Sequence, residues 1–289
     1  MSAEAALHWA GQTGAWVAAL LGLVLLIRRP FAKAFGAQAT YWLWALPAIR
    51  LLMPELRVLP APDAPTHTVQ SPASATMREP NPLFPTDTAL ATDALQGMVP
   101  TLLALWAGGA VLWFAHTHFR HQRFRRALVA RSRPATDFQP VLQNAAHRAG
   151  LRRLPELRLD PDGAGPLVMG LFRPLVVLPA NAETRFSPAE LRHALLHECV
   201  HIRRRDLLAA HAALLFRAVN WPNPLVHLAA PAFRADQEAA TDAHVLRLSG
   251  DAVGYAQTLL NAARHATAGP DALGLTLSSP PPPSLETEP

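Results

Sequence analysis

Three apolar segments dominate the first 115 residues of the chain. Residues 9–27, WAGQTGAWVAALLGLVLLI, carry no charge and are long enough to cross a bilayer as a helix. Residues 39–53 are shorter and contain Pro47 and Arg50, but an arginine near a helix end can extend to the membrane interface. Residues 98–115 are uncharged and rich in Leu and Trp. The pattern predicts two N-terminal transmembrane helices within residues 1–53 and a third at 98–115.

The basic residues beside these segments indicate an orientation. Arg28 and Arg29 follow the first segment, and the run HTHFRHQRFRRALVARSR follows the third. A secretory signal peptide would carry its basic residues before the apolar segment, so we expect an uncleaved helix. Because basic flanks mark the cytoplasmic side, we expect a multi-pass protein of the bacterial inner membrane. Its N-terminus would lie outside, and the chain from His116 onward would begin in the cytoplasm.

Two segments have the composition of linkers. Residues 54–97 are rich in Pro, Ala, Thr and Ser and show no sustained periodicity, which is typical of an extended loop. The predicted topology places this loop on the extracytoplasmic side. Residues 266–289 end in SSPPPPSLETEP and are predicted to form a disordered, Pro-rich tail.

Composition and charge narrow the class of partner. Half of the 289 residues are hydrophobic, 16% are charged, and the formal net charge is +5. A basic chain can bind nucleic acid, but here the charge clusters beside apolar segments, which favours contact with anionic lipid. We therefore expect the lipid bilayer as a partner and no direct contact with nucleic acid. Cys199 is the single cysteine, which excludes an internal disulfide, and we expect it to serve packing.

Residues 116–265 have the pattern of a globular domain. An amphipathic helix is predicted at 139–151, a short strand at 157–159, and two apolar strands within 166–179 around a Gly-Leu-Phe-Arg-Pro turn. Prolines at both ends should confine these two strands to sheet edges or strand starts. Ser187-Pro-Ala-Glu190 is a strong helix start, with a capping serine, a first-turn proline and a glutamate three residues after the cap.

The helix that begins there contains HECVH at residues 197–201. Because successive helical residues are about 100° apart, His197 and His201 lie about 40° apart on one face and about 6 Å apart along the axis. Two imidazoles on adjacent turns can bind one tetrahedral zinc ion. Glu198 lies beside them, where its carboxylate can take a proton from a zinc-activated water. The motif predicts two zinc ligands and a catalytic base.

A catalytic zinc site also needs a third protein ligand and an open fourth position. The downstream sequence RADQEAATDAHVL predicts a second amphipathic helix, on which Glu238 and Asp242 share a face. One of them can bind the metal while the other orients a histidine, because two carboxylates at this spacing repel each other without a cation between them. Asp206 is a further candidate for orienting a histidine, or a helix-end residue. Three other histidines are interpreted as surface or interfacial residues: His193, His211 and His244.

The ordered set of segments resembles the BlaR/MecR-type family of membrane-embedded zinc metallopeptidases, the antibiotic-sensing signal transducers and their relatives. The resemblance covers roughly residues 5–262 and rests on ATYWLWALPAIRLLMP, GLFRPLVVLP, SPAELRHALLHECVHIRRRD, NWPNPLVHLA, RADQEAATDAHVL and YAQTLL. It implies a mainly α membrane protein with three to four transmembrane helices. An α+β, zincin-like cytoplasmic metallopeptidase domain would be inserted between the third and fourth of them.

The resemblance also implies roles for individual residues. These are zinc ligands for His197, His201 and Glu238, a base for Glu198, and a supporting carboxylate for Asp242. Residues 207–230 would correspond to the fourth membrane helix, although their own pattern equally fits a segment in the interface. The β-lactam receptors of the family carry a sensor with a Ser-x-x-Lys motif, and this chain has none because Lys33 is its only lysine. We expect either a short member without the C-terminal sensor or a sequence that lacks a downstream region.

The function predicted is peptide-bond hydrolysis in regulated proteolysis, either of the protein itself or of a cytoplasmic transcriptional repressor. The alternatives are a quality-control membrane protease with broad substrates and a non-catalytic anti-repressor scaffold. The scaffold is disfavoured because a structural zinc site needs no base. The GLFRPLVVLP segment is expected to act as an edge strand that pairs with the substrate backbone. The candidate residues for this contact are Gly170, Leu171, Phe172 and Arg173.

Overall fold

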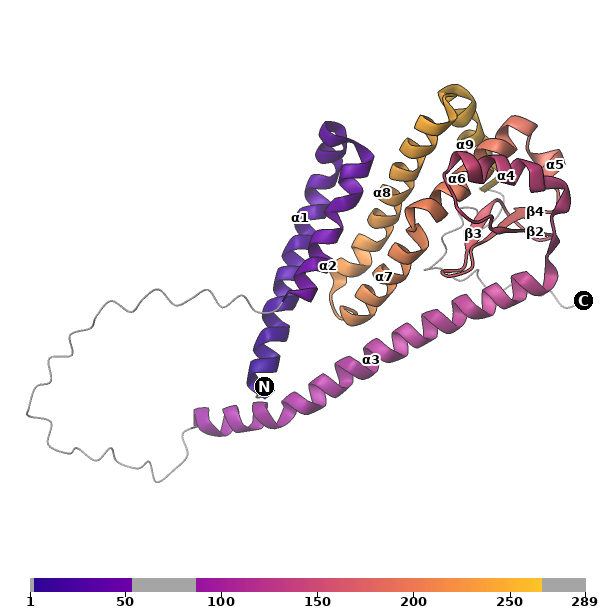
Figure 1. Ribbon diagram of the computed structural model, residues 1–289. Helices are drawn as coiled ribbons and strands as arrows, with labels where there is room; N and C mark the ends of the chain where they lie inside the picture. The colour runs from indigo at the N-terminus through magenta and orange to yellow at the C-terminus, as the bar shows by residue number, and fades with distance from the viewer. Residues whose placement is uncertain (1–2, 54–86, 267–289) are drawn as a thin grey trace, which may run out of the picture.

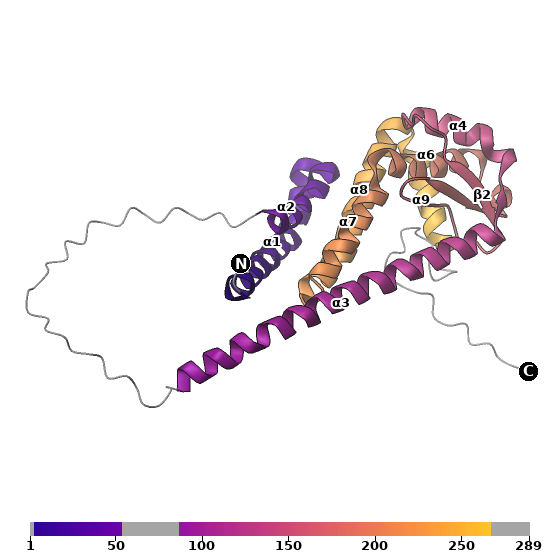
Figure 2. The ribbon, with the colours of Figure 1, turned by 60° about the horizontal axis from the view of Figure 1, so that its bottom comes forward.

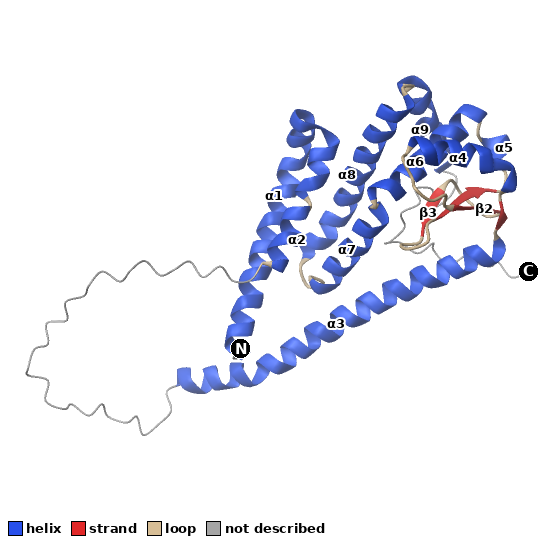
Figure 3. Cartoon of the chain, in the orientation of Figure 1, coloured by secondary structure: helices blue, strands red, loops and turns tan. Residues whose placement is uncertain are grey.

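The computed structural model describes residues 3–53 and 87–266 and is mainly helical, with one small sheet (Figures 1 and 3). The expected extracytoplasmic loop lies outside the described residues as far as residue 86, and the expected tail lies outside them from residue 267. Long helices form one part of the molecule, and the sheet with its covering helices forms the other. The metal motif lies on a helix that joins the two parts.

The first two apolar segments form a helical hairpin. Helix α1 covers Ala3–Leu43 and α2 covers Ala45–Leu52. The α1 helix is interrupted at Gly36, which has φ 84° and ψ 168°, a conformation that glycine adopts without a steric penalty. The chain turns back in this region, so that the second leg runs beside the first (Figure 1). The basic residues Arg28 and Arg29 therefore lie toward the closed end of the hairpin.

Helix α3, Asp87–Arg131, is 45 residues long and joins the third apolar segment to the basic run that follows it. Residues 87–97 were expected to belong to the loop, but they are helical because the Pro-rich composition ends at Pro85 and Ala and Leu follow. At 1.5 Å per residue the helix is about 68 Å long, more than twice the thickness of a bilayer core. It can therefore cross a membrane and still reach the sheet.

Two helical segments of the described chain are long and apolar enough to cross a membrane, Ala10–Leu52 and Gly97–Arg131. The core helix of a soluble protein can pass the same test of length and composition, but such a helix is mostly covered by protein. Only 22% of the apolar window in the first segment and 6% of that in the second is buried. Apolar surface of this extent needs an apolar environment, which a bilayer supplies.

The segment 207–230 is not the single helix that was expected. It forms α7, Asp206–Val219, and the first part of α8, Pro224–Ser249. The helix ends at Asn220, and the side chain of Asn223 then caps the new helix by accepting a hydrogen bond from the amide of Leu225 at 3.0 Å. Proline at the first helical position completes this start. The resulting α7–α8 hairpin lies between the α1–α2 hairpin and α3 (Figures 1 and 2).

The sheet confirms the strands predicted from the sequence. Its strands are β1 Arg133–Pro134, β2 Glu156–Asp160, β3 Leu167–Met169 and β4 Leu175–Pro179. Their order is β1-β2-β4-β3, with β2 and β4 parallel and the other two pairs antiparallel. Of the two expected alternatives, sheet edge or strand start, β3 takes the first as an edge strand, and β4 takes the second, because Pro174 directly precedes it. This strand pairs on both sides because its prolines stand at its end and before its start, where no ladder hydrogen bond is lost.

Short helices surround this sheet: the 3₁₀ turn Thr136–Phe138, α4 Gln139–Arg148, α5 Ala182–Arg185, α6 Pro188–Arg204 and α9 Ala252–Ala266. The α4 helix confirms the amphipathic segment predicted before Gly150. Every residue of β4 is buried, and its side chains alternate between two cores. Val176 and Leu178 face the core shared with α4 and α6, whereas Leu175 and Val177 contact Leu128 of α3. Each such side chain contributes about 1.5–3 kcal/mol by leaving water.

Candidate metal centre

Helix α6 carries the HECVH motif and is fixed at both ends. Ser187 accepts a hydrogen bond from the amide of Glu190, whose carboxylate accepts one from the amide of Ser187, which completes the predicted capping box. At the other end Arg205 adopts a left-handed conformation with φ 61°. The chain turns sharply there, and Asp206 immediately starts α7. This turn brings the Asp206 carboxylate back to His201.

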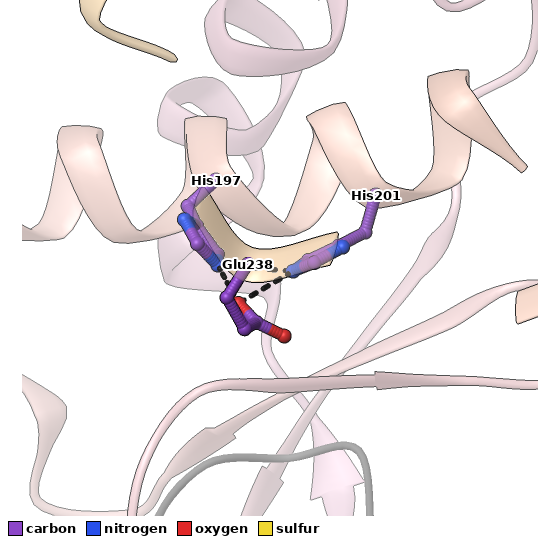
Figure 4. A group of neighbouring side chains, drawn as sticks. All are labelled: His197, His201 and Glu238. Carbon is purple, nitrogen blue, oxygen red and sulfur yellow. Dashed lines mark hydrogen bonds and ion pairs between the residues drawn. The ribbon is translucent and has the colours of Figure 1, made fainter. Parts of the chain in front are cut away.

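Three side chains from α6 and α8 converge on one point (Figure 4). The Nε2 atoms of His197 and His201 are 3.0 Å apart, and Glu238 Oε2 lies 3.4 Å from the first and 3.5 Å from the second. Ligands of a tetrahedral zinc ion at bond lengths of 2.0–2.1 Å are separated from one another by about 3.4 Å. The donor types and their spacing therefore fit zinc.

His201 is held from behind by a buried carboxylate. Its Nδ1 lies 2.8 Å from Asp206 Oδ2, which also accepts hydrogen bonds from Thr241 Oγ1 at 3.0 Å and Arg204 Nε at 3.1 Å. The side chains of His201 and Asp206 are only 4% and 1% exposed. With Nδ1 donating to this carboxylate, the lone pair of His201 is on Nε2, which faces the other two donors.

His197 is held through a tyrosine. Its Nδ1 lies 2.7 Å from Tyr255 Oη, and the Tyr255 hydroxyl donates to Asp242 Oδ1 at 2.6 Å. Asp242 itself is 3.3 Å from the same Nδ1. Sequence reasoning identified Asp242 but missed Tyr255, which belongs to α9 and is 58 residues away from His197. The YAQTLL segment was the only sequence signal at this position.

Burial and neighbouring charges shift the pKa values of these groups. Burial raises the pKa of Glu198, although both histidines of the motif oppose this shift. Burial would lower the pKa of His197, but the carboxylates of Asp242 and Glu238 outweigh it and raise the value to about 10. The pKa of His201 is raised in the same way by Asp206 and Glu238. In the absence of a metal the site therefore holds protons, and a cation must displace them to bind.

The sequence profile of the family described as BlaR1 peptidase M56 matches residues 13–277, which is most of the chain. The chain belongs to this family. The M56 peptidases are metallopeptidases, in agreement with the His/Glu donor group. The BlaR/MecR-type resemblance inferred from the ordered segments is thereby confirmed.

Individual M56 relatives match over shorter stretches. The regulatory protein BlaR1 of Bacillus licheniformis is 34% identical over 91 residues, which are 32% of this chain and 15% of that protein. The methicillin resistance mecR1 proteins of Staphylococcus aureus and Staphylococcus epidermidis are 28% identical over 83 residues, which are 29% of this chain and 14% of theirs. The chain thus matches about one seventh of the length of these relatives.

The other sequence candidates of this M56 protein do not belong to the donor group. Gly170–Arg173 form the turn between β3 and β4, where Phe172 is 91% exposed and Gly170 has φ 89°. A Cβ atom at Gly170 would lie 2.4 Å from the carbonyl oxygen of Arg173, so glycine is required for this turn. His193, expected at a surface or an interface, is buried and lies 3.2 Å from Thr258 Oγ1.

Proposed function

We propose that this protein is a membrane-bound zinc metallopeptidase that hydrolyses peptide bonds with an activated water molecule. The observation that carries the proposal is the convergence of His197, His201 and Glu238 within 4.8 Å, beside the buried carboxylate of Glu198. Three protein donors leave one tetrahedral position open, as catalytic sites require and closed structural sites do not. A base beside an open position distinguishes a hydrolase from a site that serves only stability.

Some side chains of the site would bind or orient the metal ion, and Glu198 would transfer protons. Zinc bound at the three donors would lower the pKa of a water molecule and polarise the substrate carbonyl. Glu198 would take the proton of that water and deliver it to the leaving amine. Its raised pKa brings it closer to the neutral range in which a shuttle of this kind is effective. Asp206 and Tyr255 would keep the imidazoles oriented while the proton moves.

The substrate would bind along β3 rather than at the turn that follows it. This strand, Leu167–Met169, is the edge of the sheet and packs against α6, whereas β4 is paired on both sides. An edge strand offers unpaired N–H and C=O groups to an extended peptide. We therefore propose that the substrate backbone pairs with Leu167–Met169, just before the GLFRPLVVLP segment that was predicted to make this contact. Gly170–Arg173 would then act by shaping the end of this edge.

The membrane topology is proposed from the hairpin and from α3. Three crossings, at residues 9–27, 39–53 and 98–115, would place Arg28, Arg29 and the basic run on the cytoplasmic side. The sheet and the metal centre follow the basic run and would form a zincin-like domain on that side. Relatives named as regulatory and methicillin resistance proteins support a role in signalling, with the protein itself or a cytoplasmic repressor as substrate.

The test measures metal content and peptide cleavage on detergent-purified wild type, Glu198→Gln and a control, Glu183→Gln, whose side chain is exposed on α5. We expect about one zinc per chain in all three proteins, and cleavage by wild type and Glu183→Gln only. Self-cleavage is followed by mass spectrometry, and a peptide library supplies other substrates. Zinc retained by Glu198→Gln together with undiminished cleavage would refute the role of this carboxylate.

A further inference from the structure

An apolar cavity of about 270 Å³ lies between the two helical hairpins, α1–α2 and α7–α8. Aromatic and aliphatic side chains line it from both hairpins: Tyr41, Trp42 and Trp44 from the first, and Phe216, Val226 and Phe233 from the second. Four alanines of α7, at positions 209, 210, 212 and 213, also face this space. Small side chains on the facing helix leave a volume that the bulky residues opposite do not fill.

Two cations line the same cavity. The guanidinium groups of Arg217 on α7 and Arg234 on α8 interact electrostatically with each other. The Nε atom of Arg217 is buried without a hydrogen-bond partner, and no carboxylate forms an ion pair with this arginine in residues 3–53 and 87–266. Ionisable side chains within a membrane protein's helical bundle are rare and by default indicate a functional site. A buried guanidinium nitrogen without a hydrogen-bond partner, next to an apolar space, favours an anionic ligand with an apolar tail.

The depth of these cations matches the inner surface of the proposed membrane. The guanidinium carbon of Arg217 lies 5.0 Å from the ring centre of Trp113 on α3. Trp113 stands two residues before the end of the apolar segment 98–115, and the basic run begins at His116. In the proposed topology this level is that of the lipid headgroups on the cytoplasmic side.

We propose that this cavity binds one acyl chain of an anionic amphiphile, with its carboxylate or phosphate against Arg217. The volume accommodates on the order of nine methylene groups, if each takes about the space of one water molecule, near 30 Å³. The apolar walls suit the acyl chain, and the guanidinium group of Arg217 suits an anionic headgroup. The inference rests on the membrane insertion proposed above but not on the metal or on peptidase activity.

The test uses dodecanoate brominated near its methyl end as a contact quencher of tryptophan fluorescence, because Trp42 and Trp44 line the cavity. The full chain is studied in nanodiscs of zwitterionic lipid. Ala213→Phe fills the cavity, and Leu215→Phe adds comparable bulk to the exposed face of the same helix. Arg217→Gln removes a lining cation, and Arg247→Gln removes an exposed cation of α8 outside the cavity. Zinc content and thermal unfolding, measured on every variant, establish folding independently of cleavage.

We expect saturable quenching in wild type and both controls, about tenfold or more weaker binding in Arg217→Gln, and no saturable quenching in Ala213→Phe. Dodecanol has the same chain without the charge. Its affinity for the wild-type cavity, measured by competition with brominated dodecanoate, should be as low as the affinity of dodecanoate for Arg217→Gln. Equal quenching of all five proteins would show simple partition into the bilayer and would overturn the proposal. Because Ala213→Phe and Arg217→Gln test the walls and the charge separately, misfolding of one leaves the other decisive.

A second arm distinguishes the two sources of the same chemistry. Brominated phosphatidylglycerol in the nanodisc tests a membrane phospholipid, and added brominated dodecanoate tests a free fatty acid. Quenching that depends on Arg217 in either arm supports the site and identifies the source. If the quenching depends on Arg217 in neither arm, the cavity proposal is overturned, whether or not the same preparations bind zinc and cleave peptides. Failure of the metallopeptidase proposal would appear only in the zinc and cleavage measurements.

Discussion

Tyr255 offers the sharpest test of how the metal centre is held. Its side chain is 1% exposed, and its hydroxyl makes two short contacts, 2.7 Å to His197 Nδ1 and 2.6 Å to Asp242 Oδ1. Burial raises the pKa of this hydroxyl further above its ordinary value, with Asp242 adding to the shift, so it stays protonated. The relay therefore runs from the imidazole N–H to the tyrosine oxygen and from the tyrosine O–H to the carboxylate.

Tyr255→Phe removes both hydrogen bonds and keeps the ring. Loss of an outer partner of a metal-binding histidine typically weakens metal affinity by about 10–100-fold. Asp242 already lies 3.3 Å from the same Nδ1 and can replace the lost acceptor, so we expect the lower end, about tenfold or 1.4 kcal/mol. The double variant Tyr255→Phe, Asp242→Asn also loses this replacement carboxylate, and we expect a loss of about 100-fold.

The chain contains a matched comparison, because Tyr41 is its only other tyrosine and reaches the metal centre only through Gln237, so Tyr41→Phe should lose less zinc affinity than Tyr255→Phe. The Tyr41 hydroxyl accepts a hydrogen bond from Gln237 Nε2 at 3.1 Å and makes no contact with a histidine of the motif in the described residues. Zinc affinity is measured by competition with a chromophoric chelator on purified protein. Wild-type affinity in Tyr255→Phe, or an equal loss in Tyr41→Phe, would refute the relay.

Four further predictions concern the site and the helices that support it. The pKa of His197 without metal is about 10, so zinc binding between pH 7 and 10 should release about one proton from this residue. Zinc affinity should therefore rise about tenfold per pH unit over this range. Calorimetry in buffers with different heats of ionisation measures both quantities. The charged His197 stabilises the metal-free protein fully below its unfolded pKa of about 6.5, and this contribution should fade as pH rises through 10. Asp160→Asn weakens a bidentate contact with the arginine at the end of α3, and should cost about 1–3 kcal/mol in chemical unfolding, because the carboxylate is 2% exposed whereas the arginine, 37% exposed, regains water. Gly109→Val should lower the melting temperature more than Gly108→Val, because a Cβ at Gly109 would lie 2.8 Å from the Trp221 ring whereas Gly108 has no neighbour within 4 Å.

The features predictable from the sequence were those set by local spacing. The i,i+4 separation of His197 and His201 and the cap at Ser187 were visible because one helix contains them all. Glu238 and Asp242 were found by the same helical spacing on a second segment. Each of these inferences needed only the geometry of a single element.

The features that were missed depend on contacts between elements. Tyr255 reaches His197 only because α9 folds against α6, and nothing in its neighbouring sequence specifies that partner. The interior position of β4 depends on β2, which the sequence placed as a strand but could not pair. The single membrane helix at 207–230 was implied by the family resemblance, and the segment's own pattern equally fitted the interface. The structure breaks it between Asn220 and Asn223, where the sequence Asn-Trp-Pro-Asn-Pro is typical of a turn.

The position of Glu238 is tied to the membrane hairpin through the two residues that precede it. Asp236 accepts hydrogen bonds from Arg28 at 2.7 Å and from Trp44 at 2.8 Å, so it is fixed to both legs of the hairpin. Gln237 donates to Tyr41 and to the backbone carbonyl of Asp206, which itself supports His201. Along α8, Asp236 thus contacts the α1–α2 hairpin, Gln237 contacts both α1 and the turn after α6, and Glu238 faces the two histidines. Because these contacts join α1 to the residues beside Glu238, we expect that a displacement of α1 against α8 would shift the proposed third metal donor.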